Sequence, residues 1–177
     1  YFDENFFYSR LQKSLSYRSS SNMASNAKRL VHGEADGFPG LIIDQYNQVL
    51  VLQFLSVGME YWREVLIRQL IDLTRLECVF ERSDTEVRRL EGLERQCGSI
   101  LGELPPNFVI KEHGLEYYID VKNGQKTGFY LDQRANRAKI QEISNNREVL
   151  NCFCYTGGFS LNALRGGAKF VTSIDSS

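Results

Sequence analysis

Residues 149–175 hold the pattern that most constrains the fold of this chain. An apolar run that begins at Val149 is followed by the adjacent glycines Gly157 and Gly158 and then by a stretch with helical spacing. A second apolar run, KFVTSID, ends in Asp175. Strand, glycine turn, helix and strand in this order predict a βαβ unit, the element from which doubly wound α/β sheets are built.

The glycine turn and the terminal acid also limit the ligand that such a unit would bind. Asp175 lies about 17 residues beyond Gly158, near the roughly 20-residue offset at which a carboxylate accepts hydrogen bonds from ribose hydroxyls. The G-x-G-x-x-G motif of dinucleotide sites is absent. A cofactor with a ribose and an adenine but no phosphates, S-adenosylmethionine, fits this turn better. A βαβ crossover without a ligand is the open alternative.

The residues before this unit predict an α+β domain. A helix is expected over 3–18, with Asp3 as its N-cap, and an amphipathic helix over 60–75. Apolar runs separated by DQYNQ predict a hairpin. The expected architecture is an antiparallel or mixed sheet with its helix on one face. The expected strands are at 41–43, 49–55, 78–81, 99–101 and 108–111.

Four segments follow from these patterns. The chain of 177 residues is long enough for one domain and part of another. We expect an N-terminal helix and linker at 1–26, a central α+β domain at 27–121, a hairpin and helix at 122–148, and an incomplete Rossmann-like unit at 149–177.

Charge and cysteine content narrow the functional classes. The formal net charge is −1, so any nucleic-acid contact must rest on a local patch. Residues 122–139 carry five basic side chains and one acid, whereas 81–95 mixes both signs and reads as a solvated face. The four cysteines lack metal-ligand spacing. No apolar run is long enough for a membrane helix, so we expect a cytoplasmic protein with free, buried thiols at Cys152 and Cys154.

The stretch HGEADGFPG is a second candidate site. His32, Glu34 and Asp36 could make an acid–base group, yet glycine- and aspartate-rich loops are common as plain turns. We favour the turn.

Longer motifs support a family resemblance. RLVHGEADGFPGLIIDQY, ERSDTEVRRLEGLE, GQKTGFYLDQRANR and VLNCFCYTGGFSLNALRGGAKFVTSIDSS occur in that order. Together they resemble the ribosomal RNA large-subunit methyltransferase I family, which is similar to other S-adenosylmethionine-dependent cytosine-C5 RNA methyltransferases. The resemblance implies an N-terminal PUA RNA-binding domain, a central α+β domain and a Rossmann-like methyltransferase domain in the intact enzyme.

The resemblance also implies site residues. It places GFYLDQRANR over the methionine end of the cofactor, CYTGGFS in the cofactor turn, and the acid of the second strand on the ribose. Within the basic segment 122–139, we expect Arg134 to lie near the cofactor, and Lys126 and Arg137 to face large-subunit RNA. The cofactor residues are Phe129, Gln133, Arg134, Tyr155, Thr156, Gly157, Gly158, Ser160 and Asp175, and the RNA residues are Lys126 and Arg137.

The chain departs from this family in two respects. We expect a fragment without the PUA segment and without the motif that carries the cysteine nucleophile, so no catalytic residue is assigned and the fragment itself is expected to be inactive. A half-built sheet would leave strand edges for a homodimer. The alternatives are a non-catalytic RNA-binding or assembly module and, less favoured, a dinucleotide oxidoreductase.

Overall fold

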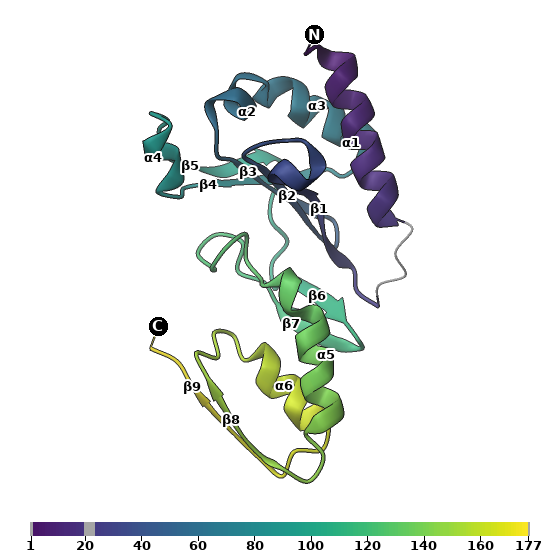
Figure 1. Ribbon diagram of the computed structural model, residues 1–177, viewed down its shortest axis with the longest axis vertical. Helices are drawn as coiled ribbons and strands as arrows, with labels where there is room; N and C mark the ends of the chain where they lie inside the picture. Colours follow the sequence, from purple (N-terminus) through teal and green to yellow (C-terminus); the bar gives the residue numbers. More distant parts are fainter. Residues whose placement is uncertain (1, 20–23, 177) are drawn as a thin grey trace. The chain divides into compact units, whose positions relative to one another are not determined.

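The computed structural model describes residues 2–19 and 24–176 (Figure 1). Its contacts divide the chain into two compact units, Tyr1–Phe129 and Tyr130–Ser177. Part of the linker expected before residue 27, namely 20–23, lies outside the described residues.

The first unit is built on a five-stranded mixed sheet in the order β1-β2-β3-β4-β5. Neighbouring strands pair antiparallel except β3 and β4, which are parallel because two helices cross over between them. This confirms the mixed α+β arrangement. The strands are β1 (Ala27–His32), β2 (Leu41–Tyr46), β3 (Val49–Phe54), β4 (Cys78–Ser83) and β5 (Gln96–Leu101).

Helices cover one face of this sheet (Figure 1). The apolar core lies between these helices and the sheet. The Asp3 Oδ1 atom accepts a hydrogen bond from the Phe6 N–H at 2.8 Å, so the expected N-cap is confirmed. Phe7 and Leu11 are buried in the core. The helices are α1 (Glu4–Ser19), α2 (Val57–Tyr61) and α3 (Arg63–Thr74), with a 3-10 turn, η1 (Gly33–Asp36), after β1.

The strand expected at 108–111 forms, but it does not join the main sheet. β6 (Val109–Glu112) pairs with β7 (Leu115–Tyr118) in a separate two-stranded sheet, and Glu112 also forms an isolated bridge with Ser25, just before β1. His113 and Gly114 both have positive φ and form a tight two-residue turn. This turn folds β6 back on the next segment of the chain, so that its hairpin partner is β7.

The hairpin expected within 122–148 does not form, because side-chain hydrogen bonds make a turn there instead. The Asp120 Oδ1 atom accepts hydrogen bonds from the backbone N–H groups of Lys122 and Asn123 at 3.0 and 2.9 Å. Donation by the Asn123 N–H is the main cause that lowers the pKa of Asp120 below its usual value. Further turns lead to a 3-10 turn and a helix, and the next strand begins at Glu148.

The mixed-charge segment 81–95 is solvated only in part, because Glu81, Arg82 and Arg88 are buried while most of the residues from 86 to 95 are exposed. Arg88, in the short helix α4 (Val87–Leu90), is 1% exposed. Its Nη1 atom donates to the Phe54 carbonyl at 2.5 Å and to Glu60 at 2.7 Å. Its Nε atom donates to the Glu94 carbonyl at 2.7 Å. A guanidinium is tolerated in this interior because each of these groups accepts a hydrogen bond from it.

The second unit contains a parallel pair of strands with a helix between them. β8 (Glu148–Cys152) and β9 (Phe170–Ile174) are parallel neighbours, with Glu148 opposite Phe170 and Cys152 opposite Ile174. α6 (Gly158–Arg165) connects them, so strand, helix and strand follow in the predicted order. α5 (Arg134–Ile143), preceded by the 3-10 turn η2 (Leu131–Gln133), contacts α6.

No helix in the described part of the chain is both long and apolar enough to cross a membrane.

Candidate functional site

The turn between β8 and α6 has an unusual backbone. Phe153, Tyr155 and Gly157 all have positive φ, at 59, 49 and 78°. For the two aromatic residues this conformation is sterically costly, and such costs concentrate at binding sites. The Gly157 N–H donates to the Cys154 carbonyl at 2.8 Å, and the Cys154 N–H donates to the Ile174 carbonyl at 3.2 Å. The turn therefore has a defined shape and is held to the end of β9.

Asp175 joins the second strand to this turn. Its Oδ2 atom accepts a hydrogen bond from the Tyr155 N–H at 2.6 Å, while the residue itself is exposed. Both groups follow the carboxyl ends of parallel strands, the edge at which open α/β sheets bind ligands. The structure thus brings together the predicted glycine turn and the predicted acid.

Ser160 does not line the turn, contrary to prediction. The residue is 8% exposed, and α6 begins two positions earlier, with Gly157 as its N-cap. The Ser160 Oγ atom accepts a hydrogen bond from Asn151 Nδ2 at 2.8 Å and lies 2.6 Å from Ser173 Oγ. Its hydroxyl therefore links α6 to both strands. Asn151 was missed as its partner, although an amide inside the apolar run VLNCF is a signal that could have found it.

The segment before α5 reaches the turn through an aromatic pair. The rings of Tyr130 and Tyr155 are edge to face, with centroids 5.6 Å apart. Arg134 opens α5 and is half-buried. The half-buried Gln133 donates to Asp132 and accepts from Asn136. Thr156 is exposed, and Gly157 and Gly158 are half-buried.

Arg137 does not face outward, so the prediction that it contacts RNA phosphates is wrong. Its side chain is 2% exposed, and its Nη1 atom donates to the Tyr130 carbonyl at 2.8 Å. Position 137 falls on the buried side of α5, which a count of basic residues along the sequence cannot show. Lys139 pairs with Glu142 at 2.7 Å on the same helix. Of the basic side chains in this segment, Arg137 is thus buried and Lys139 is paired, whereas Lys122 and Lys126 are exposed.

In the first unit, a buried cluster on β2 holds the segment that ends at Phe129. The carboxylate of Asp44 receives two hydrogen bonds from Arg29, at 2.8 and 2.9 Å. The Thr127 hydroxyl donates to Asp44 Oδ2 at 2.6 Å, so the Tyr46 hydroxyl, 2.7 Å away, must donate to Thr127. Burial, and then the charge of Asp44, raise the pKa of Tyr46 far above its usual value, which keeps the phenol protonated.

Phe129 lies inside the first unit. Its ring packs on Tyr117, with centroids 5.2 Å apart, and the residue is buried. The Tyr46 hydroxyl is also 3.3 Å from the Phe129 carbonyl. From β4, Arg82 Nη1 donates to the carbonyls of Val121 and Gly124 at 2.5 and 3.1 Å. Side chains of two central strands thus hold the segment that contains Thr127 and the exposed Lys126.

The acid–base group considered at HGEADGFPG is a turn. Asp36 accepts two hydrogen bonds from Arg18, at 2.9 and 2.6 Å, and one from the His32 backbone N–H at 2.6 Å. The carboxylate therefore stabilises the local structure, as the plain-turn interpretation expects.

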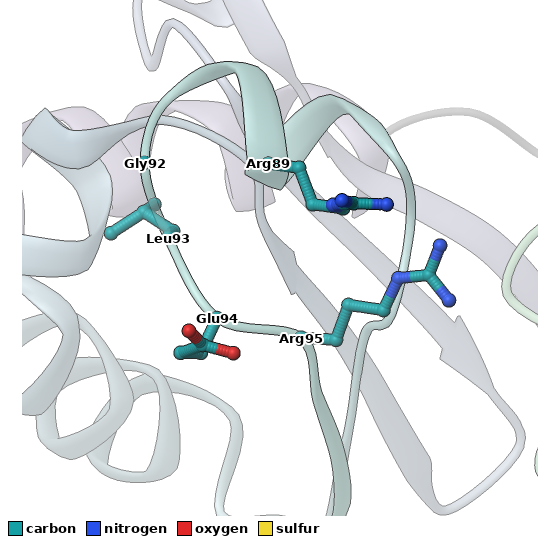
Figure 2. Close-up of a pocket in the computed structure, with 5 residues that line it drawn as sticks. All are labelled: Arg89, Gly92, Leu93, Glu94 and Arg95. Carbon is teal, nitrogen blue, oxygen red and sulfur yellow. The ribbon is translucent and has the colours of Figure 1, made fainter.

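A hollow of about 500 Å³ lies beside α4 (Figure 2). The side chains of Arg89 and Arg95 extend in the same direction, and that of Glu94 extends in the opposite direction (Figure 2). Both arginines form ion pairs with Glu86. Because Glu86 and Glu94 balance the two arginines, this hollow has no excess charge to select an ion.

Metal and thiol chemistry receive no support from the geometry. Within residues 2–19 and 24–176, no group of three or more histidine, cysteine or acidic side chains is placed to hold a metal. All four cysteines are free. Cys152 is exposed and Cys154 is half-buried, so the expectation of two buried thiols is wrong for Cys152. Its side of β8 is not covered by α6.

Comparisons with known proteins decide the family. A sequence profile described as S-adenosylmethionine-dependent methyltransferase matches residues 28–177. This chain belongs to that family. The cofactor of this family is S-adenosylmethionine.

Named relatives agree with this assignment. The chain is 49% identical to Ribosomal RNA large subunit methyltransferase I of Tolumonas auensis over 98% of its own length, and 45% identical to the Escherichia coli SMS-3-5 protein of that name over 99%. It spans only 45% of the length of each relative.

Solved structures of methyltransferases share the fold. A Streptococcus mutans protein described as a SAM-dependent methyltransferase superposes with a TM-score of 0.86 at 25% identity, covering 100% of this chain and 46% of that one. A methyltransferase complexed with SAH gives the same values. The M. jannaschii tRNA m1G37 methyltransferase has a TM-score of 0.58 at 24% identity, with 93% of this chain and 44% of that chain covered, and shows the fold alone.

Proposed function

We propose that this chain is part of a methyltransferase that transfers a methyl group from S-adenosylmethionine to large-subunit ribosomal RNA, with cytosine C5 as the target. The observation that supports this most directly is the joining of Asp175 to the strained turn at Tyr155, in a chain 49% identical to a protein named for that activity. The unit formed by β8, α6 and β9 then serves as the first βαβ unit of a Rossmann-like domain.

The proposed contacts follow from the geometry of the second unit. Gly157 has a φ of 78°, which a residue with a Cβ atom adopts only at a cost. Because neither Gly157 nor Gly158 has a side chain, the cofactor can approach the backbone there. The exposed carboxylate of Asp175 accepts hydrogen bonds from the ribose. Tyr155, Thr156, Gln133 and Arg134 remain candidates for the adenine and methionine ends. Phe129 is retained on the family resemblance, whereas Ser160 does not belong to this set.

The cofactor supplies an activated methyl group when it is bound. Methylation at C5 of a cytosine also needs a thiolate that adds to the ring and a base that removes a proton. The family resemblance does not match the nucleophile to any of the four cysteines of this chain. We therefore assign neither the thiolate nor the base to one of its residues. Its role in this proposal is to bind and orient the cofactor.

Methyl transfer is expected to be undetectable for the purified chain alone. With labelled S-adenosylmethionine and naked large-subunit RNA, the RNA should acquire no label above a protein-free control. Label incorporated at a cytosine would show that the chain carries the complete chemistry.

An Asp175→Ala variant is expected to bind S-adenosylhomocysteine at least about tenfold more weakly. A charge-assisted hydrogen bond contributes roughly 1.5–3 kcal/mol, and about 1.4 kcal/mol corresponds to a tenfold change in affinity. Isothermal titration calorimetry with S-adenosylmethionine, S-adenosylhomocysteine and NAD measures this and tests the cofactor class. Glu142→Ala, which removes an exposed acid from α5, is the matched control and should bind like the unmodified chain.

The proposal also includes a cellular compartment and a homodimer. Four free cysteines suit a reducing cytoplasm. In the described part of the chain β8 and β9 pair only with each other, and we infer that two copies of the chain associate through the outer edges of these strands.

A further inference from the structure

A second cleft, of about 660 Å³, lies between α1 and η1 in the first unit. Basic and aromatic side chains of α1 form one wall, and the chain from Glu34 to Gly37 forms the other. The residues that matter to the argument are Arg10, Lys13, Tyr17, Arg18, Glu34 and Asp36.

Three of these residues form a stripe on α1. Arg10, Lys13 and Tyr17 are separated by three and four positions, the spacing that places side chains on one side of a helix. All three are exposed, and Tyr17 is 75% exposed. The adjoining side of the helix carries Phe7 and Leu11 into the core. The stripe therefore lies on an exposed flank of a helix whose orientation is fixed by these core contacts.

The walls of the cleft are held together by buried or partly buried contacts. The Ser14 hydroxyl donates to the Leu30 carbonyl at 2.7 Å, which fixes α1 against β1. Arg18 donates to Asp36 at 2.9 and 2.6 Å and also to Ser14 Oγ at 2.8 Å. The cleft is thus preformed, and the charges of Arg18 and Asp36 offset each other.

The remaining charge in the cleft is positive. The Arg10 guanidinium lies 4.7 Å from the Phe6 ring centroid and close to the backbone of Gly37. In the described part of the chain, neither Arg10 nor Lys13 forms an ion pair with a carboxylate, and Glu34 is the one other acid in the lining. The hollow beside α4 differs, because Glu86 pairs there with both arginines.

We propose that this cleft binds a single-stranded segment of the RNA substrate, with phosphates at Arg10 and Lys13 and a base stacked on Tyr17. Cationic side chains next to an exposed aromatic ring are the combination that binds single strands, because phosphates and base faces are recognised together. The inference rests on the proposed RNA methyltransferase function. It adds α1 to the RNA-binding residues expected in the segment 122–139, of which Arg137 is buried and Lys126 is exposed.

The test is the salt dependence of RNA affinity. A fluorescein-labelled, mixed-sequence single-stranded RNA of about twelve nucleotides, within the range of single-strand site sizes, is titrated with the chain over a range of salt concentrations, with anisotropy as the readout. The double variant Arg10→Gln/Lys13→Gln should bind at least about tenfold more weakly at low salt, and its slope of log affinity against log salt should fall by about 0.7 for each phosphate that is no longer neutralised. Tyr17→Leu should weaken binding at least about fivefold without changing that slope.

A charge-matched control separates a local site from general attraction. Arg75→Gln/Arg89→Gln also removes two exposed positive charges from the first unit, outside this cleft. It should leave both the affinity and the slope close to those of the unmodified chain. Circular dichroism and S-adenosylhomocysteine titration should show that every variant is folded and binds the cofactor normally.

The possible results judge the inference and the proposed function separately. Equal reductions in affinity for the two double variants, an unchanged slope in the α1 variant, or no RNA binding by the unmodified chain would overturn the cleft as an RNA site. None of these results bears on the cofactor titration with Asp175→Ala, which judges the proposed function alone.

Discussion

An Asp44→Ala variant is expected to be less stable than the unmodified chain by about 3 kcal/mol in free energy of unfolding. Asp44 is fully buried and accepts hydrogen bonds from Arg29 and Thr127. Removing one partner of a buried ion pair costs roughly 3–5 kcal/mol, and the lower end applies because the Arg29 side chain is 28% exposed and can be hydrated. Urea denaturation followed by circular dichroism measures the change.

The control is Asp72→Ala, which removes a carboxylate that is 63% exposed and lies 3.9 Å from Arg75. Its effect on the free energy of unfolding should stay within about 0.5 kcal/mol, as for most surface substitutions. Equal losses of stability in the two variants would contradict the structural role assigned to the Asp44 cluster.

Arg88→Ala is expected to cost about 3–4 kcal/mol in free energy of unfolding, within the range for breaking a buried charged network. The substitution leaves the carbonyls of Phe54 and Glu94 without this donor, removes the partner of Glu60, and opens a cavity beside α4. Thermal and urea denaturation measure the loss of stability.

Arg89 provides the control for the loss of stability expected in Arg88→Ala. Arg89→Ala removes the same side chain one position along α4, but Arg89 is 70% exposed. Its effect should stay within about 0.5 kcal/mol, as for most surface substitutions. Similar destabilisation in the two variants would contradict the structural role assigned to Arg88.

The elements predictable from the sequence are those whose pattern is local. The helix behind Asp3, the β2–β3 hairpin and the strand, turn, helix and strand order around Gly157 all follow from spacing and turn chemistry over short windows. The joining of Asp175 to the turn was also predictable in outline, since the carboxyl ends of parallel strands share one edge.

The errors concern properties that depend on distant partners. Arg88 and Arg137 look like surface charges until the structure supplies the carbonyls that accept their hydrogen bonds. Ser160 looks like a ligand-binding residue until Asn151 and Ser173 are placed beside it. β6 pairs with β7 in a sheet of its own, whereas its apolar pattern is equally compatible with the main sheet. Composition records which groups are present, but it does not record which of them meet.

The alternation of left-handed residues at 153, 155 and 157 has a consequence for how this chain can change over evolution. Glycine in place of Phe153 or Tyr155 would relieve backbone strain of the order of 1–3 kcal/mol per site, so selection for heat resistance alone would favour those replacements. At position 155 it would also remove the ring that meets Tyr130. The turn is therefore a place where thermal robustness and a preformed ligand surface are in competition.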